Sequence, residues 1–99
     1  MAEYEFYSIE NLKKVERAFE LGGAKPHDCY DLAIDYLTDC KVICDRFKNG
    51  EYDVKTAYNE IYLTRDHYTK GYRRIINSKS FDDVQIDIMY QLTRIEVGK

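Results

Sequence analysis

The sequence has no tryptophan, one proline and five glycines among its 99 residues, and its consecutive apolar residues never number more than three. A helix that crosses a bilayer needs about 20 apolar residues, so the sequence predicts no membrane span. The N-terminal residues contain neither a basic stretch nor an apolar run, so no secretory signal peptide is predicted either. We therefore expect a cytoplasmic protein, and its length is typical of one domain, here residues 1–99.

Cysteine is scarce as well, and the three cysteines suggest neither a disulfide framework nor a metal centre. Their number is odd, and no signal peptide directs the chain to an oxidising compartment. A structural zinc site needs four ligands, and neither His27 nor His67 is placed to complete a set with Cys40 and Cys44. All three cysteines, Cys29 included, share the apolar face of one predicted helix. We expect them to be buried thiols in the core, with no metal and no cofactor.

The motifs of common enzyme classes are absent too. The chain contains no phosphate-binding loop, no nucleophile elbow and no glycine-rich dinucleotide-binding loop. A carboxylate-bridged di-iron centre needs a glutamate three residues before a histidine, and neither histidine has one. We therefore expect a protein without enzymatic activity and assign no catalytic residues.

The sequence does contain helical periodicity, and we predict an all-α fold, a compact antiparallel bundle of three to four helices joined by short loops. The first helix is predicted over 9–21, between a capping Ser8 and a terminating Gly22–Gly23 pair. The second is predicted over 28–48, with Asp28 as its cap. One face of this helix is apolar throughout and comprises Cys29, Leu32, Ala33, Tyr36, Leu37, Cys40, Ile43, Cys44 and Phe47.

A third helix is predicted over 54–76, with Asp53 as its cap. Gly71 lies inside this segment and weakens the helix by about 1 kcal/mol relative to alanine. Arg65 falls on the apolar side of the helix. We expect Arg65 either to pair with an acid or to extend its aliphatic stem along the core.

The C-terminal segment, 81–95, fits two structures. Every second residue from 84 to 92 is apolar, which is typical of a strand: Val84, Ile86, Ile88, Tyr90 and Leu92. Ser80 and Asp83 form the pattern of a capping box, and the segment is longer than most strands, which favours a helix. We predict a helix and keep the strand as the alternative.

Charge is unevenly distributed along the chain, although the net charge is only −3. Residues 1–60 carry a net charge of −5 and residues 61–99 one of +2. The second helix carries four aspartates at helical spacing, which we call the acidic row: Asp28, Asp31, Asp35 and Asp39. The first two suit the positive end of the helix dipole, whereas the last two lie too far from it. The row is either a solvated face or a surface offered to a basic partner.

A basic face is predicted on the third helix, where it comprises His67, Lys70, Arg73 and Arg74 and continues to Lys79. The helix dipole favours cations near a C-terminus, which is an ordinary explanation for this face. Contact with nucleic acid is the alternative. Four or five cations in an acidic chain are a weak signal for such contact.

Tyrosine is abundant, with ten residues, and exposed tyrosines are common in protein interfaces. Tyr30 and Tyr62 lie off the predicted apolar stripes. We therefore predict a non-catalytic protein-binding module that presents the acidic row, with Tyr30 and Tyr62 as anchors, to a basic protein such as a nucleic-acid-binding protein.

By class analogy, such a chain resembles the small helical inhibitors and regulators that phages and mobile elements direct against host defence. Two alternatives stay open. The basic face could bind nucleic acid, or the chain could be a structural subunit of a phage-type assembly. The sequence leaves the oligomeric state open.

Overall fold

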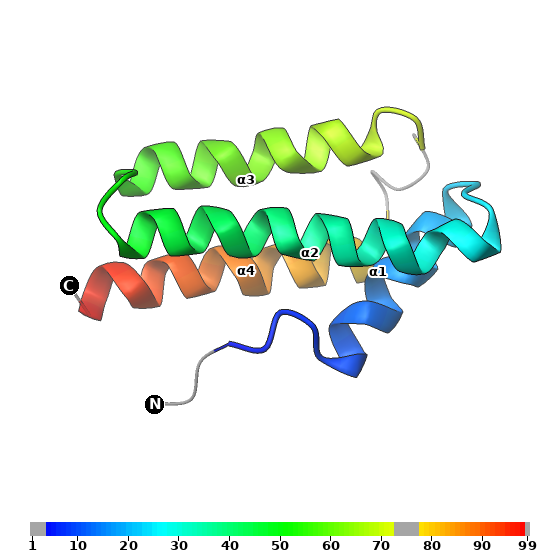
Figure 1. Cartoon of the computed structure of the whole chain (residues 1–99), viewed down its shortest axis with the longest axis horizontal. Helices are drawn as coiled ribbons and strands as arrows, with labels where there is room; N and C mark the ends of the chain where they lie inside the picture. Colours follow the sequence, from blue (N-terminus) through cyan, green and yellow to red (C-terminus); the bar gives the residue numbers. More distant parts are fainter. Residues whose placement is uncertain (1–3, 73–77, 99) are drawn as a thin grey trace.

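The computed structural model describes residues 4–72 and 78–98, which fold into four α-helices. Figure 1 shows them in chain order as α1 (Ile9–Leu21), α2 (Pro26–Lys48), α3 (Val54–Thr69) and α4 (Lys79–Gly98). The predicted all-α class is confirmed. Within the described ranges, no helix has the length and apolar character needed to cross a membrane.

Helix α1 begins and ends where the sequence predicts. The Ser8 hydroxyl oxygen accepts a hydrogen bond from the Asn11 backbone N–H at 3.1 Å. At the other end Gly23 has a φ of 100°, a left-handed conformation that glycine adopts without strain. The following Ala24 N–H donates back to the Phe19 carbonyl at 2.9 Å, which satisfies one of the last carbonyls of the helix.

Helix α2 begins two residues earlier than predicted, and Asp28 is not its cap. Pro26 is its first residue and Lys25 the capping residue, whose side chain makes no capping hydrogen bond. Proline suits this position because its fixed φ is already helical and its missing N–H would have had no partner there. The carboxylate of Asp28 instead lies in the first turn, where the helix dipole still favours it. The C-terminal end at Lys48 agrees with the prediction.

Helix α3 ends at Thr69, seven residues before the predicted end. Its start is as predicted, since the Asp53 carboxylate accepts from the Thr56 N–H at 2.7 Å. Gly71 therefore follows the helix instead of lying inside it. Glycine loses more backbone freedom than other residues in a helix, which favours an end at this point. The rest of the predicted helix, from residue 73 on, lies outside the described residues.

Helix α4 spans Lys79–Gly98 and is longer than the predicted 81–95. The strand alternative is wrong. Ser78, not Ser80, caps the helix, because its hydroxyl accepts from the Phe81 N–H at 3.3 Å.

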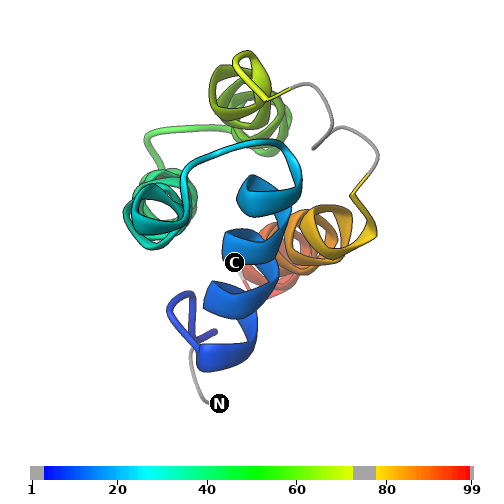
Figure 2. The ribbon, with the colours of Figure 1, turned by 90° about the vertical axis from the view of Figure 1, so that its right-hand side faces the viewer.

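Three of the helices pack in alternating directions. In Figure 1, α2 and α3 run antiparallel, and so do α3 and α4. Figure 2 shows that α1 crosses the other three steeply, so the predicted antiparallel packing is wrong for this helix. Helix α1 packs against both α2 and α4. Helix α1 therefore covers the side of the bundle that α2 and α4 form.

Each helix contributes one aromatic ring to the centre of the core. Phe81 of α4 packs against Tyr36 of α2, with ring centroids 4.7 Å apart, and against Phe19 of α1 at 6.1 Å. Tyr68 of α3 packs edge-on against Tyr36 at 5.7 Å. Edge-to-face pairs of this kind add to the stability that burial alone supplies. The eight buried residues of α2 all belong to its predicted apolar face, of which Leu32 is only partly buried.

The Tyr36 hydroxyl is buried and has no hydrogen-bond partner of ordinary geometry in the described part of the chain. Its polar neighbour is the Cys40 thiol, a weak acceptor, one turn along α2. Burial, and then Cys40, raises the pKa of Tyr36 well above its ordinary value.

Replacing Tyr36 by phenylalanine is therefore expected to raise the free energy of unfolding by about 1–2 kcal/mol, because a desolvated hydroxyl is removed without a cavity. Urea unfolding of the variant measures the change. Tyr68→Phe is the matched control. The Tyr68 hydroxyl donates to Asp39 at 2.7 Å, so the loss of this hydroxyl should destabilise the protein. A loss of stability in Tyr36→Phe would mean that the Cys40 thiol is an effective partner.

Candidate interaction surface on helix α2

The acidic row lies along one side of α2. Asp28 is partly buried and the other three aspartates are exposed. His27 Nε2 lies 3.4 Å from an Asp28 carboxylate oxygen. Among residues 4–72 and 78–98, neither Asp31 nor Asp35 makes an ion pair or a side-chain hydrogen bond. These two carboxylates lie one turn apart, about 6 Å along the helix, and remain available to a partner.

Asp39 differs from the rest of the row because it holds α2 to α3. The Tyr68 hydroxyl of α3 donates to an Asp39 carboxylate oxygen at 2.7 Å. The pKa of Tyr68 is raised, first by burial and then by the hydrogen bond to Asp39 and the charges of Asp39 and Asp35. Asp39 therefore has a structural role, and its pairing with Tyr68, 29 positions later, was not visible in the sequence.

The two predicted tyrosine anchors do not lie beside the acidic row. Both Tyr30 and Tyr62 are 53% exposed. Each residue turns an α-helix by about 100°, so Tyr30 lies about 140° around α2 from Asp35. Tyr62 belongs to the side of α3 that faces α4, because Tyr58, one turn earlier, donates to or accepts from Thr93 of α4 at 2.6 Å. The structure thus separates the carboxylates from both tyrosines.

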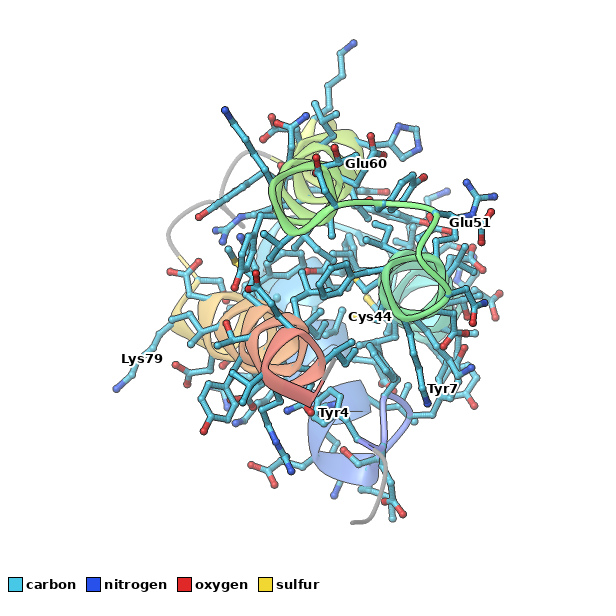
Figure 3. All side chains as sticks on the ribbon, turned by 90° about the vertical axis from the view of Figure 1, so that its left-hand side faces the viewer. Tyr4, Tyr7, Cys44, Glu51, Glu60 and Lys79 are labelled. Carbon is cyan, nitrogen blue, oxygen red and sulfur yellow. The ribbon has the colours of Figure 1, made fainter. Side chains whose placement is uncertain are left out.

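Of the predicted basic face, the structure describes His67, Lys70 and Lys79. His67 is exposed, with its ring edge-on to Tyr68 at 5.2 Å, and Lys70 caps the end of α3. Lys79 starts α4, and Figure 3 shows its side chain pointing away from the bundle. Arg73 and Arg74 lie outside the described residues.

The three cysteines are buried, as the sequence predicts: Cys29 and Cys44 are 4% exposed and Cys40 is 0% exposed. Figure 3 shows Cys44 directed into the space between the helices. Burial raises the pKa of the Cys40 and Cys44 thiols to about 12, which makes them unreactive at neutral pH. In the described ranges, no three histidine, cysteine or acidic side chains are grouped so that they could hold a metal ion.

Arg65 pairs with an acid, one of the two expectations for it. Its guanidinium lies 2.6 Å from an Asp82 carboxylate oxygen of α4 and also donates to the Gln85 side chain. The same group sits 5.1 Å from the centroid of the Phe81 ring. Gln85 is 4% exposed, so Arg65 supplies the partner that this buried amide needs. These contacts have a structural role and join α3 to α4.

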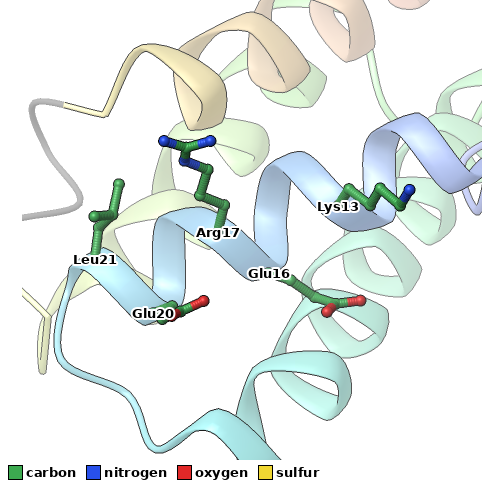
Figure 4. Close-up of a pocket in the computed structure, with 5 residues that line it drawn as sticks. All are labelled: Lys13, Glu16, Arg17, Glu20 and Leu21. Atoms are coloured by element: carbon green, nitrogen blue, oxygen red, sulfur yellow. The ribbon is translucent and has the colours of Figure 1, made fainter.

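A shallow depression lies on the outer surface of α1, lined by Lys13, Glu16, Arg17, Glu20 and Leu21. Figure 4 shows Arg17 and Leu21 on the side nearer the start of α4 and the two glutamates on the other side. Its charges are of mixed sign and none of the lining residues is buried. The depression therefore favours no ligand of a single charge.

Comparisons with protein families, with curated proteins and with solved structures found no match for this chain. The geometry of its own surface is therefore the basis for a functional proposal.

Proposed function

We propose that the protein is a small protein-binding module, of the inhibitor or regulator type, that presents Asp31 and Asp35 of α2 to lysine and arginine side chains of a basic partner. The observation that carries the proposal is that these two carboxylates are exposed and make no ion pair within the described residues. Like charges one turn apart cost a few tenths of a kcal/mol, which a binding role offsets.

The position of the two aspartates suits a recognition surface. They lie on a helix whose opposite face is buried along its length, so the carboxylates project from a rigid support. A rigid surface loses little conformational freedom on binding. Val42, about two turns beyond Asp35 on the same side, is 42% exposed and supplies an apolar contact that the two tyrosines do not.

Replacing Asp31 and Asp35 together by asparagine tests the proposal. The variant should keep its thermal stability or gain slightly, because a like-charge pair is removed. Its association with a basic protein captured from a cell lysate should slow by about three- to tenfold at low salt, since interface charge acts mainly on the association rate.

The matched control is Glu16→Gln/Glu20→Gln, which removes an acid pair at the same spacing from α1, of which Glu16 is partly buried and Glu20 is exposed. The control should bind as the wild type does. The proposal is wrong if both double variants capture the same proteins with the same kinetics, or if the Asp31/Asp35 variant unfolds, which would show that its carboxylates serve the fold.

A further inference from the structure

The turn that joins α2 to α3 contains an asparagine followed by a glycine, Asn49 and Gly50. It lies at one end of the bundle (Figure 1). Asn49 is the capping residue at the C-terminal end of α2, and both residues are exposed. Among residues 4–72 and 78–98, the side-chain amide of Asn49 has no hydrogen-bond partner. This amide is therefore free to react.

An asparagine side chain can react with the backbone of its own chain. The amide nitrogen of the next residue attacks the side-chain carbonyl carbon, a succinimide ring closes, and Nδ2 leaves as ammonia with the proton of the attacking nitrogen. One water molecule then opens the ring and gives aspartate, or isoaspartate with one more methylene group in the backbone. Glycine in the second position favours ring closure, because it has no side chain to crowd the attacking nitrogen.

The folded turn holds the attacking nitrogen away from the Asn49 side chain. The Gly50 N–H donates to the Phe47 carbonyl at 3.1 Å, and the Glu51 N–H donates to the Arg46 carbonyl at 2.8 Å. The two bonds form a Schellman motif, in which Gly50 has a φ of 84°. The ψ of Asn49 is 0°, and ring closure needs a rotation about this bond. The reaction therefore requires the turn to open.

The burial pattern allows the turn to open while the bundle stays folded. Phe47 is 3% exposed and anchors the last turn of α2 in the core. The next four residues, 48–51, are all exposed. Opening the turn breaks the two bonds of the Schellman motif and uncovers little apolar surface. Helix ends of this kind open at a small fraction of the free energy of global unfolding.

We propose that Asn49 is a self-modification site, at which the folded protein deamidates to aspartate and isoaspartate with water as the co-reactant. The other two asparagines that the structure describes differ from it. Asn11 is 5% exposed, and its side-chain amide donates to three acceptors in the segment before α1. Asn59 is exposed, but it lies inside α3 and precedes a glutamate, so the helical backbone prevents ring closure.

The product places a negative charge where α2 least favours it. A carboxylate at position 49 lies at the negative end of the helix dipole, one turn after Asp45. In the isoaspartate product, the longer backbone also shifts Gly50 and Glu51 out of register with the carbonyls that they bond. Conversion should therefore loosen the connection between α2 and α3. Asp35 lies about four turns earlier on α2, so the modification is independent of the proposed binding surface.

Incubation of the wild type in mildly alkaline buffer, followed by peptide mass spectrometry, tests the proposal. The peptide that contains Asn49 should gain the mass difference between a hydroxyl and an amino group, and isoaspartate methyltransferase should label it. The rate should be about tenfold lower than in the urea-unfolded chain, since only the open turn reacts. Low urea should hardly change the rate, because opening exposes little surface. Asn59 should stay unchanged, and Asn49→Gln should abolish the conversion.

The Asn49→Asp variant measures the effect of the aspartate product on stability. Its melting temperature should fall by about 2–6 °C, because the new charge opposes the helix dipole. Asn59→Asp is the matched control, adds the same charge to the middle of α3 and should melt as the wild type does. An unchanged melting temperature of Asn49→Asp would overturn the predicted loosening of the connection.

Three results would overturn the modification site itself. Asn49 could stay intact in the folded protein over a period in which the unfolded chain converts completely. The conversion rate could rise with urea in parallel with global unfolding, which would show that the turn opens only together with the whole bundle. Asn59 could convert as fast as Asn49, which would show that the turn confers no selectivity.

Discussion

Replacing Phe81 by alanine is expected to lower the free energy of unfolding by about 4 kcal/mol, because a fully buried aromatic ring is lost and the surrounding helices close only part of the cavity. Phe81 contacts Phe19 of α1 and Tyr36 of α2, and the Arg65 guanidinium of α3 lies over its ring. One substitution thus removes contacts to all three other helices. Domains of this size are stable by only about 5–15 kcal/mol, so the variant should be close to unfolding at 37 °C.

Urea unfolding followed by circular dichroism measures this effect, with two further variants for comparison. Phe81→Leu preserves most of the buried volume and should cost only about 1–2 kcal/mol. Phe6→Ala removes a ring of the same size from the edge of the same core, where Phe6 is 8% exposed and packs against Tyr4. Its cost should be clearly smaller than that of Phe81→Ala. Equal losses of stability at the two positions would show that the contacts of Phe81 to the other three helices have no special role in joining them.

Most of the helices could be predicted from the sequence because their signals are local. Ser8 and Asp53 cap helices through bonds to residues three positions later, and these patterns are visible in the chain. The buried face of α2 follows directly from the spacing of its apolar residues. The steep crossing of α1 could not be predicted in this way, because it depends on how side chains of α2 and α4 fit together in space.

The ambiguity of the C-terminal segment has a physical explanation in α4. Residues 84, 88 and 92 are buried, whereas residues 86 and 90 are exposed on the opposite face. Two apolar stripes on opposite faces of one helix produce an alternating sequence, which imitates the period of a strand.

The candidate site was only partly predictable, because the contacts of its residues are made with residues far away in the chain. The exposure of Asp31 and Asp35 agrees with the helical pattern. The hydrogen bond of Asp39 is to Tyr68, which lies 29 positions later in the chain. No local pattern links these two residues. The position of Tyr62 likewise depends on which side of α3 faces α4, which only the packed structure reveals.

Stability is expected to fall steeply as the pH rises above about 9. Burial raises the pKa of Cys40 and Cys44 from an ordinary 9.0 to about 12, because a thiolate is poorly solvated in the core. At a pH between 9 and about 12, the two thiols have lost their protons in the unfolded chain and keep them in the folded chain. The unfolded state then binds fewer protons, so rising pH favours it. Below pH 9 the contribution of both thiols is fully present, and it is lost as the pH rises towards 12.

The expected slope is about 1.4 kcal/mol per pH unit for each thiol, or about 2.7 kcal/mol for the pair. Urea unfolding at intervals from about pH 8 to pH 10.5 measures it within the range in which the thiols of the unfolded chain titrate. Cys40→Ala/Cys44→Ala should be less stable at neutral pH because of the cavities, yet its stability should depend much less on pH in this window. Cys29→Ala is the control and should retain most of the wild-type slope, since Cys40 and Cys44 both remain; burial raises the pKa of Cys29 as well.

Thiol labelling gives an independent test of the same physical cause. Attack on a disulfide reagent needs the thiolate, so Cys40 and Cys44 should react in the folded protein only as fast as it opens. The rate should then follow the opening equilibrium and rise with urea in the same way as unfolding does. Rapid labelling of both residues at pH 8 without denaturant, or an unchanged slope in Cys40→Ala/Cys44→Ala, would contradict the link between their burial and alkaline instability.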